Sequence, residues 1–138
     1  KQLQIVIRDN LTEHASKVGE ILEQKLNNLQ NSHECIGDVR GHGLYRMLDI
    51  VVDRNSKSAN PELAERIRRE AMKEGIAMIA VKNFMRICPP LIIKENEIDD
   101  IVGRLDKAIT RAVGNQTLEI EFSSSSSLAA TEKIKRVA

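Results

Sequence analysis

The sequence predicts an α+β domain in which helices pack on one face of a small, mainly antiparallel sheet. Three observations lead to this prediction. Apolar residues recur at helical spacing in three separate segments, and short apolar runs typical of strands lie between them. The resulting order is helix, strand, helix, strand, strand, helix, which suits two layers around one core. A length of 138 residues fits a single domain.

The first long helix is predicted to begin near Asn10, after a short helical or extended lead-in at residues 2–9. Asn10 can cap the helix, and Glu13, three positions later, completes a capping-box-like pair. The spacing of the apolar residues that follow predicts about five turns with one buried stripe. This stripe consists of Leu11, Ala15, Val18, Leu22, Leu26 and Leu29.

The next segment begins with three glycines, Gly37, Gly41 and Gly43, which permit bends in the chain. Residues 44–52 then read as a strand whose two faces are both mostly apolar. Strands of this kind are covered on both sides. Because one small domain has a single core, we expect one of these sides to be covered by something outside the domain.

The middle helix is predicted to begin at Pro61, which occupies the first helical position after the capping residue Asn60. Its buried stripe consists of Leu63, Ile67 and Ala71, and Gly75 ends it.

The second half of the chain is predicted to contain two strands and a helix. Residues 76–81 read as a buried strand and residues 85–88 as its partner. The last helix carries an apolar stripe and is expected to end near Gly114. The residues of this stripe are Ile98, Ile101, Val102, Leu105 and Ile109. The predicted core of the domain includes Ile50, Val52, Leu63, Ile67, Ile79, Ile87, Ile101 and Leu105.

Residues 115–138 differ from the rest because they contain the low-complexity run of serines at 123–127. We expect a domain at residues 1–114 followed by a poorly packed tail at 115–138. An additional edge strand at 117–122, where polar and apolar residues alternate, is the alternative.

The composition argues against several classes of function. Lys plus Arg is 21 and Asp plus Glu is 20, so no excess charge points to nucleic acid or an acidic membrane. The aromatic residues Tyr45, Phe84 and Phe122 are too few for base stacking. No apolar run approaches the ~20 residues of a membrane span. We therefore expect neither nucleic acid nor membrane as a partner.

Metal and cysteine chemistry also lack support. The histidines do not lie near cysteines or carboxylates at ligand spacing, so no metal site is expected. Cys35 and Cys88 form no CxxC pair and are expected to be two buried free thiols of a protein from a reducing compartment.

Two arginines, Arg40 and Arg86, lie in apolar surroundings, where a guanidinium needs a partner such as a planar carboxylate. For Arg40 we favour a salt bridge with an Asp or Glu of the domain. For Arg86, the residues alone leave open an internal salt bridge or the carboxylate of a ligand. Pro89 and Pro90 follow Arg86 closely and stop its strand.

Residues 3–113 resemble the C-terminal small domain of class III (omega) aminotransferases, enzymes of pyridoxal phosphate fold type I. The motifs "IGDVRGHGL" and "MRICPPL" carry the resemblance, and the helical segments around them agree with it. Members of the family usually have a small residue, often glycine, near the position of Met47, where this chain has the bulkier Tyr45-Arg46-Met47. They also often have glycine at the position of Lys82.

The resemblance implies that Arg86 pairs with the carboxylate of the substrate. It also implies a pyridoxal phosphate enzyme that moves an amino group from an amine or amino acid to a keto acid, and that works as a homodimer. No lysine here matches the context of the cofactor lysine, so the cofactor groups are expected on a large domain that precedes residue 1.

On this interpretation the chain is a fragment that does not transaminate alone and comes from a cytoplasmic or mitochondrial enzyme. A stand-alone, non-catalytic interaction module built on the same scaffold is the alternative.

Overall fold

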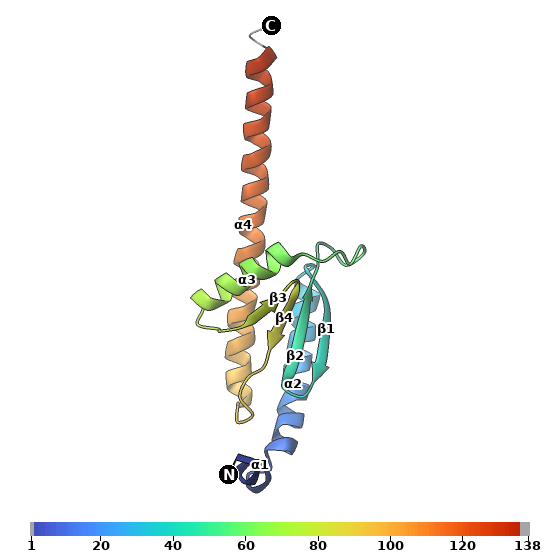
Figure 1. Ribbon diagram of the computed structural model, residues 1–138, viewed down its shortest axis with the longest axis vertical. Helices are drawn as coiled ribbons and strands as arrows, with labels where there is room; N and C mark the ends of the chain where they lie inside the picture. The colour runs from blue at the N-terminus through green and yellow to red at the C-terminus, as the bar shows by residue number, and fades with distance from the viewer. Residues whose placement is uncertain (1, 136–138) are drawn as a thin grey trace.

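The computed structural model describes residues 2–135, and it describes the side chains of residues 4–115. Four helices accompany one four-stranded sheet in this part of the chain. The strands lie in the order β1-β2-β4-β3, and each neighbouring pair is antiparallel. Helices α2 and α4 run behind the sheet, and α3 crosses α4 at one end of it (Figure 1). The predicted α+β fold class is confirmed.

The first two helices are α1, Gln2–Arg8, and α2, Leu11–Ser32. The predicted stripe of α2 faces the core, because Val18, Leu22, Leu26 and Leu29 are buried. The predicted capping box at Asn10 is wrong. Asn10 has a left-handed backbone with φ 48°, and its side chain caps no backbone N–H. Its amide donates instead to the Glu13 carboxylate.

The glycine-rich segment forms a strand of its own, which was not predicted from the sequence. Strands β1, Ile36–His42, and β2, Tyr45–Ile50, make a hairpin whose turn contains Gly43 at φ 54°. A bulge lies between Ile36 and Asp38. A Cβ on Gly37 would come within 2.8 Å of the Val51 side chain, so the missing side chain makes room for Val51.

Helix α3, Pro61–Lys73, begins as predicted. The Asn60 side chain accepts a hydrogen bond from the Leu63 backbone N–H at 3.1 Å, and Pro61 follows the cap. Gly75 lies two residues beyond the helix with φ 82°, which suits a residue without a side chain.

Strands β3, Ile79–Val81, and β4, Phe84–Ile87, form the second hairpin. The predicted strand at 76–81 begins only at Ile79, because residues 76–78 have no partner strand among the described residues. β3 is an edge strand, and its Ile79 and Val81 are exposed.

Helix α4 is longer than expected and runs over Glu95–Lys135. Gly114 does not end it, and residues 117–122 are helical, so the alternative edge strand is wrong. The side chains from residue 116 onward lie outside the described ones, and the predicted poor packing of the tail stays a prediction. No described helix combines the length and the apolar character needed to cross a membrane.

The core lies between the sheet and the helices. Of the predicted core residues, Ile50, Leu63, Ile67, Ile87 and Leu105 are buried, and Ile101 is half-buried. Val52, at 61% exposure, and Ile79, at 48%, are corrections to that prediction. Val51 is buried in place of Val52, because β2 ends at Ile50 and its alternation does not continue into the residues beyond it.

Candidate functional site

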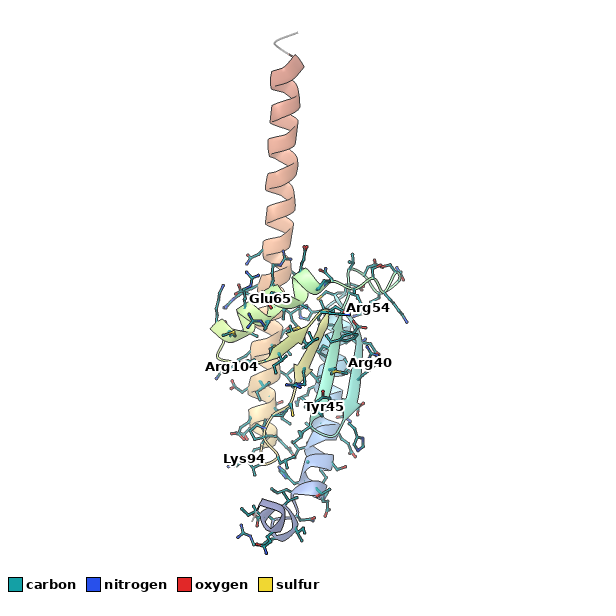
Figure 2. The ribbon with its side chains drawn as sticks, viewed as in Figure 1. Arg40, Tyr45, Arg54, Glu65, Lys94 and Arg104 are labelled. Atoms are coloured by element: carbon teal, nitrogen blue, oxygen red, sulfur yellow. The ribbon has the colours of Figure 1, made fainter. Side chains whose placement is uncertain are left out.

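The face of the sheet opposite α2 and α4 carries the candidate site. This outer face is made by alternate residues of the four strands, and the strand register sets Arg40, Met47, Arg86 and Ile79 in one row across it. The next row contains Asp49, Phe84 and Val81. Arg40 and Tyr45 come from the neighbouring strands β1 and β2 (Figure 2). The outer face therefore presents charged and apolar side chains together.

Arg86 reaches this face because of the alternation in β4. Met85 and Ile87 are buried in the core, so Arg86, between them, points the other way and is exposed. Its guanidinium has no hydrogen bond or ion pair with any other residue in the part of the chain that the structure describes. The internal salt bridge considered for Arg86 is therefore absent from the described residues.

The chain after Arg86 is held in place by two features. Pro89 and Pro90 supply no N–H groups, so strand pairing stops here. Farther on, the ring of His14, on α2, donates from Nε2 to the Ile93 carbonyl oxygen at 2.8 Å. This hydrogen bond ties the chain that follows Arg86 to α2.

Arg40 satisfies its charge within the domain, as the sequence analysis favoured. Its guanidinium lies 3.2 Å from the Asp38 carboxylate and 3.3 Å from that of Asp49. It also lies over the Phe84 ring, 5.3 Å from the ring centroid. Buried Asn83 donates to the other oxygen of Asp49. This cluster joins β1, β2 and β4 on the outer face, whereas Arg86 has no such partner among the described residues.

A third arginine, Arg46, was not singled out from the sequence. It is only 3% exposed and points into the core face of β2. Its guanidinium donates to the carbonyl oxygens of Gly41, Gly43 and Gly19 and forms an ion pair with Glu23 at 2.9 Å. The signal was present, because Arg46 stands in phase with the buried Leu48 and Ile50.

The Arg46 contacts lock the β1–β2 turn against α2. A Cβ on Gly19 would lie 2.5 Å from the backbone of Gly43, so helix and turn touch without any side chain between them.

A cleft of about 260 Å³ opens beside Arg86, and we call it the Arg86 cleft. Its sides are the segments 75–78 and 86–90, and its floor includes Ile101 and Leu105 of α4. Arg86 is the one charged residue among the described residues that line it. The cleft therefore combines apolar walls with a single cation.

The two cysteines differ in their surroundings. Cys35 is buried, and burial raises the pKa of its thiol. Cys88 is exposed and lines the Arg86 cleft, which corrects the expectation of two buried thiols. Within the described residues, no cluster of three or more His, Cys, Asp or Glu could hold a metal ion.

None of the described lysines is buried. A lysine that holds a cofactor aldehyde must act as a neutral amine, which requires desolvation or a cationic neighbour. Among the described side chains, Lys25 is half-buried but is ion-paired with Asp99. The other described lysines are exposed at the surface, namely Lys17, Lys57, Lys73, Lys82, Lys94 and Lys107.

Comparison with known proteins identifies the family. The sequence model described as aminotransferase class-III matches residues 1–109. The chain belongs to the class III aminotransferase family. Enzymes of this family use pyridoxal phosphate. The predicted resemblance is therefore confirmed.

Several relatives match most of this chain. A Caenorhabditis elegans protein named ethanolamine-phosphate phospho-lyase homolog 1 is 40% identical over 112 residues, which are 78% of this chain and 24% of the relative. The taurine–pyruvate aminotransferase of Bilophila wadsworthia is 36% identical over 116 residues, 78% of this chain and 25% of that enzyme.

The solved structure of the omega transaminase from Pseudomonas jessenii in complex with PMP is also similar. It is 30% identical, with a TM-score of 0.77, and the match covers 81% of this chain and 25% of that one. The chain thus spans about a quarter of the length of these class III relatives.

Proposed function

We propose that this chain is the small domain of a pyridoxal phosphate-dependent class III aminotransferase, with the domain formed by residues 1–114. The complete enzyme transfers an amino group from an amine or amino acid to a keto acid and works as a homodimer. The observation that carries the proposal is Arg86, a cation on the outer face of a class III domain that has no partner among the described residues.

In this proposal Arg86 binds the acid group of the substrate. A guanidinium offers a planar pair of N–H donors that match a carboxylate, and such charge-assisted bonds are stronger than neutral ones. Buried Met85 and Ile87 fix the backbone of Arg86, and the Pro89–Pro90 exit fixes where the strand stops. A donor group that is held in place before the substrate arrives orients it at little entropic cost.

We assign the pyridoxal phosphate site to the part of the class III enzyme that this chain does not span. In the complete enzyme the cofactor would supply the carbonyl group that accepts the amino group. This chain would supply Arg86 and the outer face, against which the rest of the polypeptide would pack.

Kinetics on the complete enzyme test this role. Loss of a charge-assisted contact in Arg86→Ala should cost roughly 2–4 kcal/mol in kcat/KM for an amino acid donor. The decarboxylated amine of the same amino acid should be affected much less, because it has no carboxylate. Arg86→Lys should resemble Arg86→Ala, since an ammonium cannot form the bidentate pair.

A matched control removes a surface guanidinium elsewhere. The Arg69 side chain on α3 is 64% exposed, and Arg69→Ala should leave both donors unaffected. Equal losses for the amino acid and the amine in Arg86→Ala, together with a lower Tm, would mean that Arg86 is a structural residue.

A second candidate function is the elimination of phosphate from a phosphorylated amino alcohol. The 40% identity to the phospho-lyase homolog favours it. Arg86 would then bind a phosphate, for which a guanidinium is equally suited. Incubation of the complete enzyme with ethanolamine phosphate should release inorganic phosphate if this function is correct, whereas an aminotransferase should release none.

A further inference from the structure

The Arg86 cleft joins the outer face to the core side of the domain. Ile79 of β3 pairs with Arg86, and β3 does not extend before Ile79. The segment 75–78 therefore runs beside the end of β4 without pairing to it, and α4 closes the space beneath with Ile101 and Leu105. The cleft is the gap that this arrangement leaves.

The charge and the size of the cleft together restrict its ligand. Arg86 contributes the one charge among the described lining residues, and its guanidinium has no partner in that part of the structure. An anion is therefore the complementary group. The walls include Ile76, Met78, Ile87 and Pro90, which offer apolar contact. A volume of about 260 Å³ is just below that of pockets for drug-sized ligands, so the ligand is small.

We propose that the Arg86 cleft binds the apolar side chain of a small carboxylic acid whose carboxylate pairs with Arg86. The ligand class is an acid with a short alkyl tail, and the tail lies between the segment 75–78 and α4. This inference rests on the proposed function in that it assigns Arg86 to the acid group, and it adds a preference for substrates with apolar side chains.

Binding to the 138-residue chain tests the cleft without cofactor or catalysis. Titrations with acetate, butyrate, hexanoate and hexylamine should be followed by ¹⁵N–¹H correlation spectra. Each buried methylene should tighten binding about fourfold, from acetate to hexanoate. The largest shifts should lie at residues 75–78, 86–90 and 101–105, and hexylamine should produce no shifts there.

Variants separate the two parts of the proposal. Arg86→Gln should abolish binding of hexanoate, whereas Arg40→Gln should not, because Arg40 is already paired with Asp38 and Asp49. The dispersion of the same spectra shows whether each variant is folded.

Cys88 gives a readout that needs no substitution. It is exposed and lines the cleft, while the other cysteine, Cys35, is buried. Hexanoate should slow the alkylation of Cys88 by N-ethylmaleimide several-fold more than acetate does.

The outcomes distinguish this inference from the proposed function. Equal affinity for acetate and hexanoate, lost in Arg86→Gln, would overturn the apolar cleft and leave Arg86 as an acid-binding residue. Hexanoate affinity that is unchanged in Arg86→Gln would overturn the pairing with Arg86, and with it the assignment on which the proposed function depends.

Discussion

Arg46 and Arg86 lie on neighbouring strands and use the same charge in different ways. The register places Arg46 opposite Ile87, so the two arginines project from opposite faces of the sheet. Arg46 donates hydrogen bonds to three backbone carbonyl oxygens and to Glu23, whereas the Arg86 guanidinium has no hydrogen bond or ion pair with any other described residue. A buried arginine whose guanidinium nitrogens all donate hydrogen bonds, such as Arg46, supports the structure. An exposed arginine without such partners among the described residues, such as Arg86, is available for binding.

Removal of Arg46 should destabilise the domain strongly. Arg46→Ala removes a donor from the buried carbonyl group of Gly19 and from the part-buried ones of Gly41 and Gly43, and it should lower the free energy of unfolding by roughly 2–4 kcal/mol. Glu23→Gln should cost under ~1 kcal/mol, because the Glu23 side chain is 44% exposed and the amide keeps an acceptor for Arg46. Urea unfolding of both variants measures these values. Similar losses in the two would show that the ion pair, and not the carbonyl contacts, matters.

Glu65 on α3 should titrate far below an ordinary glutamate (Figure 2). Hydrogen bonds from the Arg68 guanidinium lower the pKa of Glu65 from 4.5 to about 2, and burial opposes this only in part. Because the pKa is lower in the folded state, the stability that Glu65 contributes is present above pH 4.5. It is lost as the pH falls from 4.5 through about 2.

Carboxyl NMR across this pH range measures the titration of Glu65. Arg68→Gln should move the pKa of Glu65 back toward 4.5, since the leading cause of the shift is removed. An unchanged titration in Arg68→Gln would contradict the assigned cause.

At the scale of elements, the contribution of α3 to the stability of the domain should come from its buried face alone. Ile67 has no exposed surface, so Ile67→Ala removes buried methyl groups and should cost about 2–5 kcal/mol in the free energy of unfolding. Met72, on the same helix, is 56% exposed, and Met72→Ala should cost under ~0.5 kcal/mol. Thermal and urea unfolding of the two variants check the difference, and equal costs would contradict the observed orientation of α3.

The helices were predictable because an apolar stripe depends only on the helical spacing of residues that are close in the sequence. The stripes of α2 and α3 follow helical spacing, and each has its buried residues where that spacing places them. The end of α4 was not predictable in this way. Gly75 adopts a positive φ beyond α3, but Gly114 does not, and an interior glycine costs only about 1 kcal/mol. A glycine alone therefore does not end a helix.

The strands were harder to predict because their exposure depends on partners far along the chain. β1 was missed because its glycines indicate bends, although Gly37 provides the space that Val51 fills. Val52 was assigned to the core because no sequence pattern reveals that β2, and with it the alternation, ends at Ile50. The site was predicted in part: Arg40 and Arg86 were singled out, but Arg46 was passed over as an arginine within a strand.

At the scale of the whole molecule, the proposed function gives this chain the arginine for the acid group of the substrate and assigns the cofactor site to the rest of the enzyme. We therefore expect the 138-residue chain to bind no pyridoxal phosphate specifically. Borohydride reduction of the chain after incubation with the cofactor should fix much less than one equivalent, as measured by absorbance and mass spectrometry. Attachment of nearly one equivalent of the cofactor to a single lysine would contradict the assignment of the cofactor site to the rest of the enzyme.

The packing of α2 against α4 has a consequence for synthesis on the ribosome. His33 at the end of α2 contacts Asp106 on α4 at 2.6 Å, so elements from the two halves of the chain close the core together. The buried residues of α4 extend to Ala112. At about 5–20 residues per second, the ribosome needs roughly 4–16 s to advance from the end of α2 to that point. During this interval the leucine stripe of α2 remains partly uncovered, and chaperones that bind nascent chains can reach it.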